Sequence, residues 1–128
     1  MRIWEQCIFL PLVIAVVVSL LVNIPVTASA QDTLRVNADS VRLKFENERV
    51  RVLESILPPG GKEEMHSHPA YLVYVIRAGK IRIHTADGKV SETELKAGDV
   101  IYREPVIHWG ENIGPTEIDE ILVELKHP

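Results

Sequence analysis

The feature that most constrains this chain is a series of short apolar or alternating runs, separated by turn signals about every eight to twelve residues. Residues 41–46 alternate apolar and charged side chains, which is typical of a half-buried β-strand. Asp87-Gly88 marks a tight hairpin between two runs. The predicted strands are 41–46, 50–57, 71–76, 80–84, 89–95, 100–102, 106–112 and 116–125. No segment has the period of a convincing amphipathic helix, so we predict an all-β sandwich or barrel.

The first thirty residues have the pattern of an export signal. Arg2 gives a short positive start, and residues 7–24 are almost wholly apolar. Ala28-Ser29-Ala30 follows as a small-x-small cleavage site. We therefore expect residues 1–30 to be a signal peptide, and the protein to be periplasmic or secreted. The apolar run is also long enough to be an uncleaved anchor, and only in that form do we expect contact with a membrane.

Composition narrows the remaining possibilities. The chain has 128 residues and one cysteine, Cys7, which lies in the export segment. A mature chain without cysteine has neither a disulfide framework nor a cysteine nucleophile. Residues 31–128 are long enough to form one domain around one core. The net charge of −4 argues against a nucleic-acid partner. The acidic pair Asp119-Glu120 is explained by an exposed strand face.

The histidines carry the chemistry that the sequence predicts. His66 and His68 are two residues apart at the start of a strand. Residues i and i+2 of a strand point to the same face, roughly 6.5–7 Å apart. Two imidazoles at that spacing can share one ion, because metal–nitrogen bonds are about 2.1 Å long. His108 lies on a later strand and can supply a third ligand from across a barrel. We therefore predict that these three histidines bind a divalent transition metal.

These residues resemble two motifs of the cupin superfamily. The first motif matches Gly60, His66-Ser67-His68 and Gly79, and the second matches Gly98-Asp99, Pro105, His108 and Asn112. The resemblance runs from about Phe45 to Leu125. It implies a single-domain, jelly-roll-like β-barrel that holds its metal or ligand inside the wider mouth. It also implies a homodimer, because short cupins often pair through their sheet edges.

The sequence departs from the cupin pattern at the carboxylate. Cupin sites usually add a glutamate three or four residues after the second histidine, and here Leu72 takes that place, with Val73 next. Arg103 stands where the second motif normally has proline. A site of three histidines keeps the full charge of the ion, so it is expected to bind less tightly. It favours metals such as Zn, Cu, Ni or Fe, and Mn is a further candidate.

Other carboxylates lie close to the histidines in sequence. Glu63 and Glu64 precede the histidine pair on a loop, and Glu111 follows His108 by three residues. Positions three apart on a strand face opposite sides, so Glu111 reaches the site only across a bulge. Charged loop residues are usually solvated. We therefore expect none of the three to replace the missing ligand.

Two residues are predicted to contact a small-molecule ligand or substrate. Tyr74 shares the strand parity of the motif histidines and of Leu72, so we expect Tyr74 and Leu72 to point inward. Tyr74 can hydrogen-bond an anionic substrate or a metal-bound water, although core packing explains an inward tyrosine equally well. Tyr71 has the opposite parity unless Pro69 resets the register.

Several functions are compatible with this pattern. A metal with open positions suits an enzyme, either a dioxygenase or an isomerase acting on a small molecule. The alternative is a non-catalytic barrel that binds a small molecule or a metal ion. A third option keeps the histidines but uses no metal. A cupin fold hosts enzymes, sensors and storage proteins, so the fold alone does not choose among them.

Overall fold

The computed structural model describes residues 31–126, so the predicted signal peptide lies outside the described residues. The elements are α1 (Thr33–Val36), β1 (Val41–Glu46), β2 (Val50–Leu57), β3 (His66–His68), β4 (Tyr71–Arg77), β5 (Gly79–Thr85), β6 (Val90–Leu95), β7 (Val100–Arg103), β8 (Val106–Asn112) and β9 (Ile118–Leu125). Each of the predicted runs forms a strand, and β3 adds another at the histidine pair. The predicted hairpin turn joins β5 to β6, with Gly88 at a φ of +85°.

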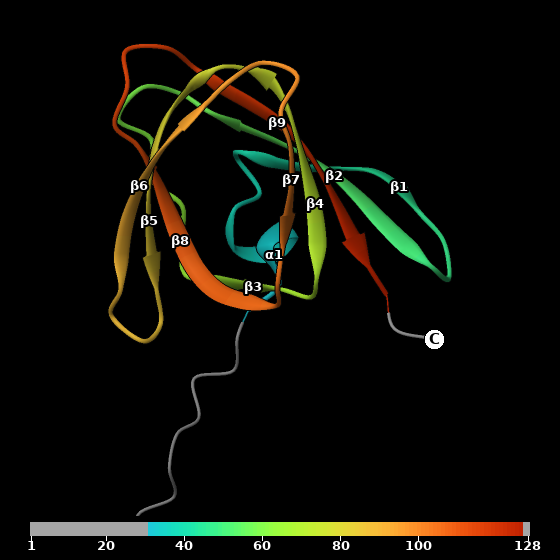
Figure 1. Cartoon of the computed structure of the whole chain (residues 1–128). Coiled ribbons are helices and arrows are strands. Elements are labelled where there is room, and N and C mark those ends of the chain that lie inside the picture. Colours follow the sequence, from blue (N-terminus) through green and yellow to red (C-terminus); the bar gives the residue numbers. More distant parts are fainter. Residues whose placement is uncertain (1–30, 127–128) are drawn as a thin grey trace, which may run out of the picture.

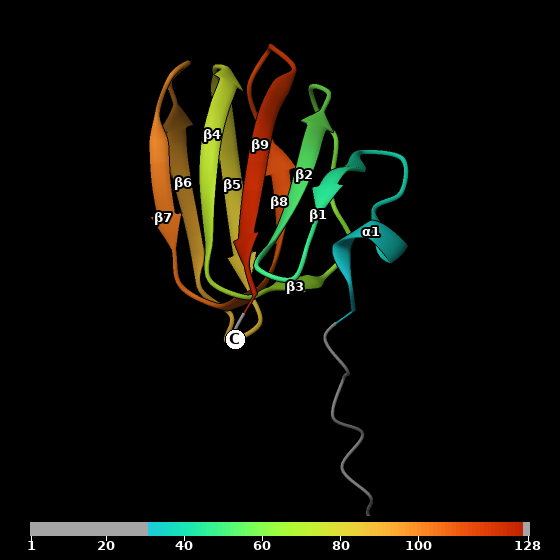
Figure 2. The ribbon, with the colours of Figure 1, turned by 90° about the vertical axis from the view of Figure 1, so that its right-hand side faces the viewer.

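The strands form two antiparallel sheets that face each other as a barrel. The five-stranded sheet has the order β1-β2-β9-β4-β7, and the four-stranded sheet has the order β3-β8-β5-β6. Figure 1 shows β5, β6 and β8 on one side of the barrel and β2 and β4 on the other, and Figure 2 shows the larger sheet in front. The chain crosses repeatedly between the sheets, so distant segments such as β2 and β9 become neighbours. The predicted all-β, jelly-roll-like barrel is confirmed.

The apolar core lies between the two sheets. On β4, Tyr71, Val73 and Val75 are buried, whereas the alternate residues Tyr74 and Ile76 are exposed. The core consists of Val41, Leu53, Leu57, Tyr71, Val73, Val75, Ile81, Leu95, Ile118 and Leu122. Full burial of such a side chain contributes about 1.5–3 kcal/mol. The packed core therefore gives a rigid frame to the polar groups that share the interior.

A short helix anchors the loop that leads into β3. Asp32 caps α1, because its Oδ1 accepts a hydrogen bond from the Leu34 backbone N–H at 2.8 Å. The buried Asn37 side chain accepts a hydrogen bond from the Glu64 N–H at 2.7 Å. This contact positions the residues immediately before the histidine pair. Within residues 31–126, no helix has the length and apolar character needed to cross a membrane.

Candidate metal centre

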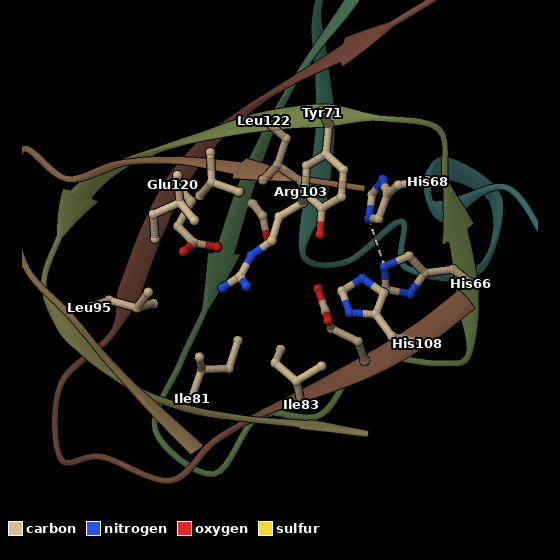
Figure 3. A pocket seen from close by; sticks show the side chains of 14 residues that line it. His66, His68, Tyr71, Ile81, Ile83, Leu95, Arg103, His108, Glu120 and Leu122 are labelled. Atoms are coloured by element: carbon tan, nitrogen blue, oxygen red, sulfur yellow. Dashed lines mark hydrogen bonds between the residues drawn. The ribbon is translucent and has the colours of Figure 1, made fainter. Parts of the chain in front are cut away.

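Three buried histidines meet in the barrel interior. β3 supplies His66 and His68, and the pairing of β3 with β8 places His66 opposite His108. The centroid of the His66 ring is 4.7 Å from those of His68 and His108, which are 5.3 Å from each other. One ligand atom from each residue lies within 4.8 Å of the others, and Figure 3 shows the rings converging. The structure thus brings together the three predicted ligands, a group that can hold a metal ion.

Hydrogen bonds determine which ring nitrogens remain available. His68 Nδ1 donates to the carboxylate of Glu124, at 2.5 Å from Oε1, so His68 Nε2 is an acceptor. His66 Nδ1 lies 2.7 Å from the Glu64 carbonyl oxygen, which only accepts, and 3.1 Å from the Asn37 amide nitrogen, which only donates. These contacts allow either tautomer of His66, whose Nε2 faces His68 Nε2 at 2.9 Å. A cation that binds beside the two Nε2 atoms selects the tautomer with the proton on His66 Nδ1, because both Nε2 lone pairs are then free.

Two of the three histidines, His66 and His108, favour their neutral, metal-binding form. Burial lowers the pKa of His108 to about 3, and the charges of the other two histidines and Arg103 act in the same direction. Burial also lowers the pKa of His66, although Glu63 and the Glu64 carbonyl oppose that shift. His108 Nε2 is buried without a hydrogen-bond partner among the described residues. A buried ring nitrogen without a partner, next to the Nε2 atoms of the other two histidines, fits a divalent metal with imidazole ligands.

A buried carboxylate supports His68 from behind. Glu124 on β9 is 2% exposed and also accepts a hydrogen bond from Arg51 Nε at 2.5 Å. Arg51 in turn pairs with Asp32 at 2.5 Å. Burial tends to raise the pKa of Glu124, but its hydrogen bonds to His68 and Arg51 outweigh that effect and lower it. The ionised carboxylate therefore holds the His68 ring with Nε2 toward the other histidines.

The role of Glu124 is absent from the sequence predictions. Its strand shows apolar residues on both faces, and Glu124 shares the parity of the buried residues Ile118 and Leu122. This shared parity is the signal that can place it inside. The partner histidine is 56 positions away along the chain, so local pattern does not connect them.

The histidines open onto a small cavity of about 50 Å³. It is lined by Ser55, Glu63, His66, His68, Tyr71, Val73, Ile81, Ile83, Leu95, Ile101, Arg103, His108, Glu120 and Leu122. Figure 3 shows the histidines on one side and Arg103 extending between Tyr71 and Glu120. An outer cavity of about 290 Å³ shares Tyr71, Ile83, Arg103 and His108 with it. The two cavities are therefore adjacent, and both border His108.

Glu120 corrects the interpretation of the acidic pair as an exposed strand face. Its side chain lines the cavity, on the same face of β9 as Leu122. Burial raises the pKa of Glu120 to about 7, Glu63 adds to this rise, and Arg103 opposes it. A carboxyl group that can exchange a proton near neutral pH therefore lies in the cavity wall.

The expected inward orientation of Tyr74 and Leu72 is wrong. Tyr74 is 48% exposed, and neither side chain lines the cavity. Pro69 and Ala70 separate β3 from β4, so strand parity does not pass from the histidines to β4. Tyr71 and Val73 face inward instead. Leu72 therefore lies on the outer face of the sheet, and the cavity-facing position nearest to the missing glutamate is Val73.

The three alternative carboxylates differ in their positions. Glu63 lines the cavity, against the expectation that it is solvated. Its N–H donates to the Gly110 carbonyl at 2.9 Å, and a Cβ at Gly110 would lie only 2.7 Å from Glu63 Oε2. Glycine at 110 thus leaves room for this carboxylate. Glu64 is exposed, and Glu111 pairs with Lys62 and Arg82.

The fold and the site define a class of protein: a small barrel of two antiparallel sheets with a buried cluster of three histidines. The sequence pattern of the cupin domain matches residues 53–123. The chain therefore belongs to the cupin family. No curated protein matches it.

Solved structures agree with this assignment. A cupin domain from Bordetella pertussis Tohama I is 31% identical, with a TM-score of 0.63 over 68% of this chain and 92% of that chain. An RmlC-like cupin family protein with a double-stranded β-helix fold, from Methanocaldococcus jannaschii, is 20% identical, with a TM-score of 0.57 over 69% and 80%. A conserved protein with a double-stranded β-helix domain, from Klebsiella pneumoniae, is 26% identical, with a TM-score of 0.52 over 65% and 68%. The two-sheet barrel is common to all of them.

Proposed function

We propose that this cupin is a metal-dependent enzyme, a dioxygenase or an isomerase, that acts on a small molecule at an ion held by His66, His68 and His108. The observation that supports this most strongly is the convergence of three buried ring nitrogens, two of them facing at 2.9 Å. Three protein ligands leave at least one coordination position open for substrate. Here the ligand cluster borders a cavity, so an open position has a space into which a substrate fits.

The chain's own residues hold and orient the ligands. Glu124 keeps the proton of His68 on Nδ1, the Glu64 carbonyl can accept the proton of His66 Nδ1, and burial favours the neutral form of His108. The ion, when bound, would supply Lewis acidity or redox chemistry. Imidazole ligands favour Zn, Cu, Ni or Fe, with Mn as a further candidate.

We further propose that the mature protein works in the periplasm or outside the cell. Arg2, the apolar run 7–24 and the small residues Ala28-Ser29-Ala30 support this location. If the segment is retained, it would instead tether the barrel to a membrane. Neither location involves nucleic acid, which the net charge of −4 disfavours.

A homodimer is part of the same proposal. The outer face of the five-stranded sheet exposes Tyr74, Ile76, Val100 and Tyr102 by 43% to 67%. Tyr74 lies opposite Val100 in the pairing of β4 with β7, so these side chains share one face. A contiguous apolar face of this kind is typical of a surface that pairs two copies.

Metal content tests the central claim. We expect mass spectrometry of residues 31–128, purified without an affinity tag, to find near-stoichiometric divalent metal. The double variant His66→Ala/His68→Ala should lose it. His84→Ala is the matched control, because His84 stacks on Trp109 with ring centroids 3.8 Å apart and lies outside the cluster. Circular dichroism establishes that all three proteins fold. Protein that stays metal-free after reconstitution with each candidate ion would contradict the proposal.

A non-catalytic binding barrel is the second candidate. The inner cavity of about 50 Å³ favours it, because that volume holds only a few water-sized groups. Nitric oxide added to the iron(II)-loaded protein separates the two. A new electron paramagnetic resonance signal from an iron–nitrosyl centre would show a position open to an external ligand, as an enzyme requires. No change in the signal would favour the binding barrel.

A further inference from the structure

The cavity wall opposite the histidines carries Arg103, an exposed residue whose side chain lines the cavity. Arg103 on β7 pairs directly with Tyr71 on β4, and both side chains line the cavity. Directly opposed residues in antiparallel strands hold their Cβ atoms about 4.5–5.5 Å apart. The guanidinium and the tyrosine hydroxyl therefore reach into the same space, as Figure 3 shows.

Arg103 has no charged partner in the part of the chain that the structure describes. The ion pairs found there involve other side chains. Glu120 also faces the cavity, but burial raises its pKa to about 7, so near neutral pH it carries only part of a negative charge. An available guanidinium in a concave site is well suited to bind a carboxylate through two parallel hydrogen bonds.

The histidine end of the cavity adds charge of the same sign. Three neutral imidazoles leave the charge of a divalent ion uncompensated, and Val73 supplies no carboxylate on the inward face of β4. Glu63 contributes one negative charge to the cavity lining. The ion and Arg103 together outweigh it, so the site attracts an anion that can contact both.

The two connected cavities limit the size of that anion. Arg103 and Tyr71 line both the inner space of about 50 Å³ and the outer space of about 290 Å³. They therefore lie at the boundary between the two cavities. A head group of a few heavy atoms fits inside, and a larger remainder has room outside.

We propose that the ligand is a small carboxylate with a second oxygen next to its carboxylate group. The carboxylate binds the Arg103 guanidinium and the Tyr71 hydroxyl, and the adjacent oxygen binds the metal held by the histidines. This inference rests on the proposed function, because it needs a metal at the three histidines. It names the class of molecule that the cavity selects.

Glycolate and its neutral analogue glycolamide test the inference on cobalt(II)-loaded protein, residues 31–128. The visible spectrum of the bound cobalt reports each titration, and mass spectrometry verifies that cobalt stays bound. We expect glycolate to bind more tightly than glycolamide, and Arg103→Gln to weaken glycolate binding about 10- to 100-fold. Glycolamide binding should change little. Arg77→Gln is the matched control, because Arg77 is an exposed arginine paired with Glu117.

Two conservative variants sharpen the result. Arg103→Lys should retain part of the affinity, because it keeps the charge but loses the two-bond geometry. Tyr71→Phe should weaken glycolate binding about 3- to 10-fold through the loss of one hydrogen bond. Cobalt uptake with a glycolate affinity that Arg103→Gln leaves unchanged would overturn this inference alone. A failure to take up cobalt would overturn the proposed function, and this inference with it.

Discussion

The two walls of the cavity differ in how their polar groups are satisfied. On the histidine wall, His68 donates to Glu124, which also accepts a hydrogen bond from Arg51, and His66 Nδ1 contacts the Glu64 carbonyl and the Asn37 amide. On the opposite wall, Arg103 and Glu120 form no ion pair within the described residues. His66 and His68 belong to a connected hydrogen-bond network, whereas the opposite wall presents Arg103 and Glu120 to the cavity.

This difference indicates that the two walls have different roles, one in metal binding and the other in ligand binding. Arg103 is exposed and lines the cavity without an ion-pair partner among the described residues, so its guanidinium is available to a ligand. On the histidine wall, the hydrogen bond to Glu124 fixes the orientation of the His68 ring and leaves the lone pair of His68 Nε2 directed toward the other histidines. We interpret the first wall as prepared for an ion and the second as prepared for a ligand.

Removing Glu124 should disrupt the hydrogen-bond network of the histidine wall, and we expect it to have the largest effect on metal affinity and stability. Glu124→Ala leaves His68 unoriented and Arg51 without its buried partner. We expect metal affinity to fall about 10- to 100-fold and the free energy of unfolding to fall by about 3 kcal/mol. Competition with a chromogenic chelator measures the first effect, and urea unfolding measures the second.

Glu124→Gln is the control for this change, because its amide oxygen can still accept the His68 proton. It should recover part of the metal affinity and less of the stability. Equal metal affinity in the alanine variant and the unmodified protein would show that His68 is oriented without Glu124.

Removing the charge of Glu120 tests whether this carboxyl group on the opposite wall destabilises the folded protein when it is ionised. The pKa of this carboxyl rises from 4.5 to about 7 on folding. Between these values the folded protein keeps a proton that the unfolded chain has lost, so the free energy of unfolding decreases as the pH rises. Above pH 7 the penalty reaches about 3 kcal/mol. Glu120→Gln should therefore stabilise the protein at pH 8 and give no gain at pH 4.

Urea unfolding at several pH values, with a chelator present, measures the effect of Glu120→Gln. The matched control is Glu117→Gln, at the exposed pair with Arg77, where we expect little change. A stability difference between Glu120→Gln and the unmodified protein that does not vary with pH would contradict the assigned titration.

Leu72→Glu should have the smallest effect on the metal, although it restores the usual cupin residue by simple spacing. Leu72 pairs with Tyr102 and Val123 and lies on the outer face of the sheet, so a carboxylate there points away from the histidines. We expect metal affinity to change less than about threefold, within the range of a remote surface charge. The chelator competition used for Glu124→Ala measures it, and a large gain in affinity would show that β4 shifts its register.

The predictions from sequence succeeded where local pattern was sufficient. Alternation and turn residues located the strands. The spacing of His66 and His68 and the resemblance of the second motif at His108 located the three histidines that meet. The face of β4 was predicted incorrectly, because Pro69 and Ala70 interrupt the strand and alternation does not continue across the break. The interior position of Glu120 was missed for a related reason, since β9 is apolar on both faces.

The sequence by itself determined the all-β class, the resemblance to cupins and the histidine cluster, because strand periodicity and motif spacing are local properties. Only the tertiary structure decided which charged residues share the interior with those histidines. Glu124 reaches His68 from 56 positions away, and Arg103 reaches Tyr71 across a strand pair. The period of a strand specifies that faces alternate, whereas the pairing of distant strands specifies which face is inside.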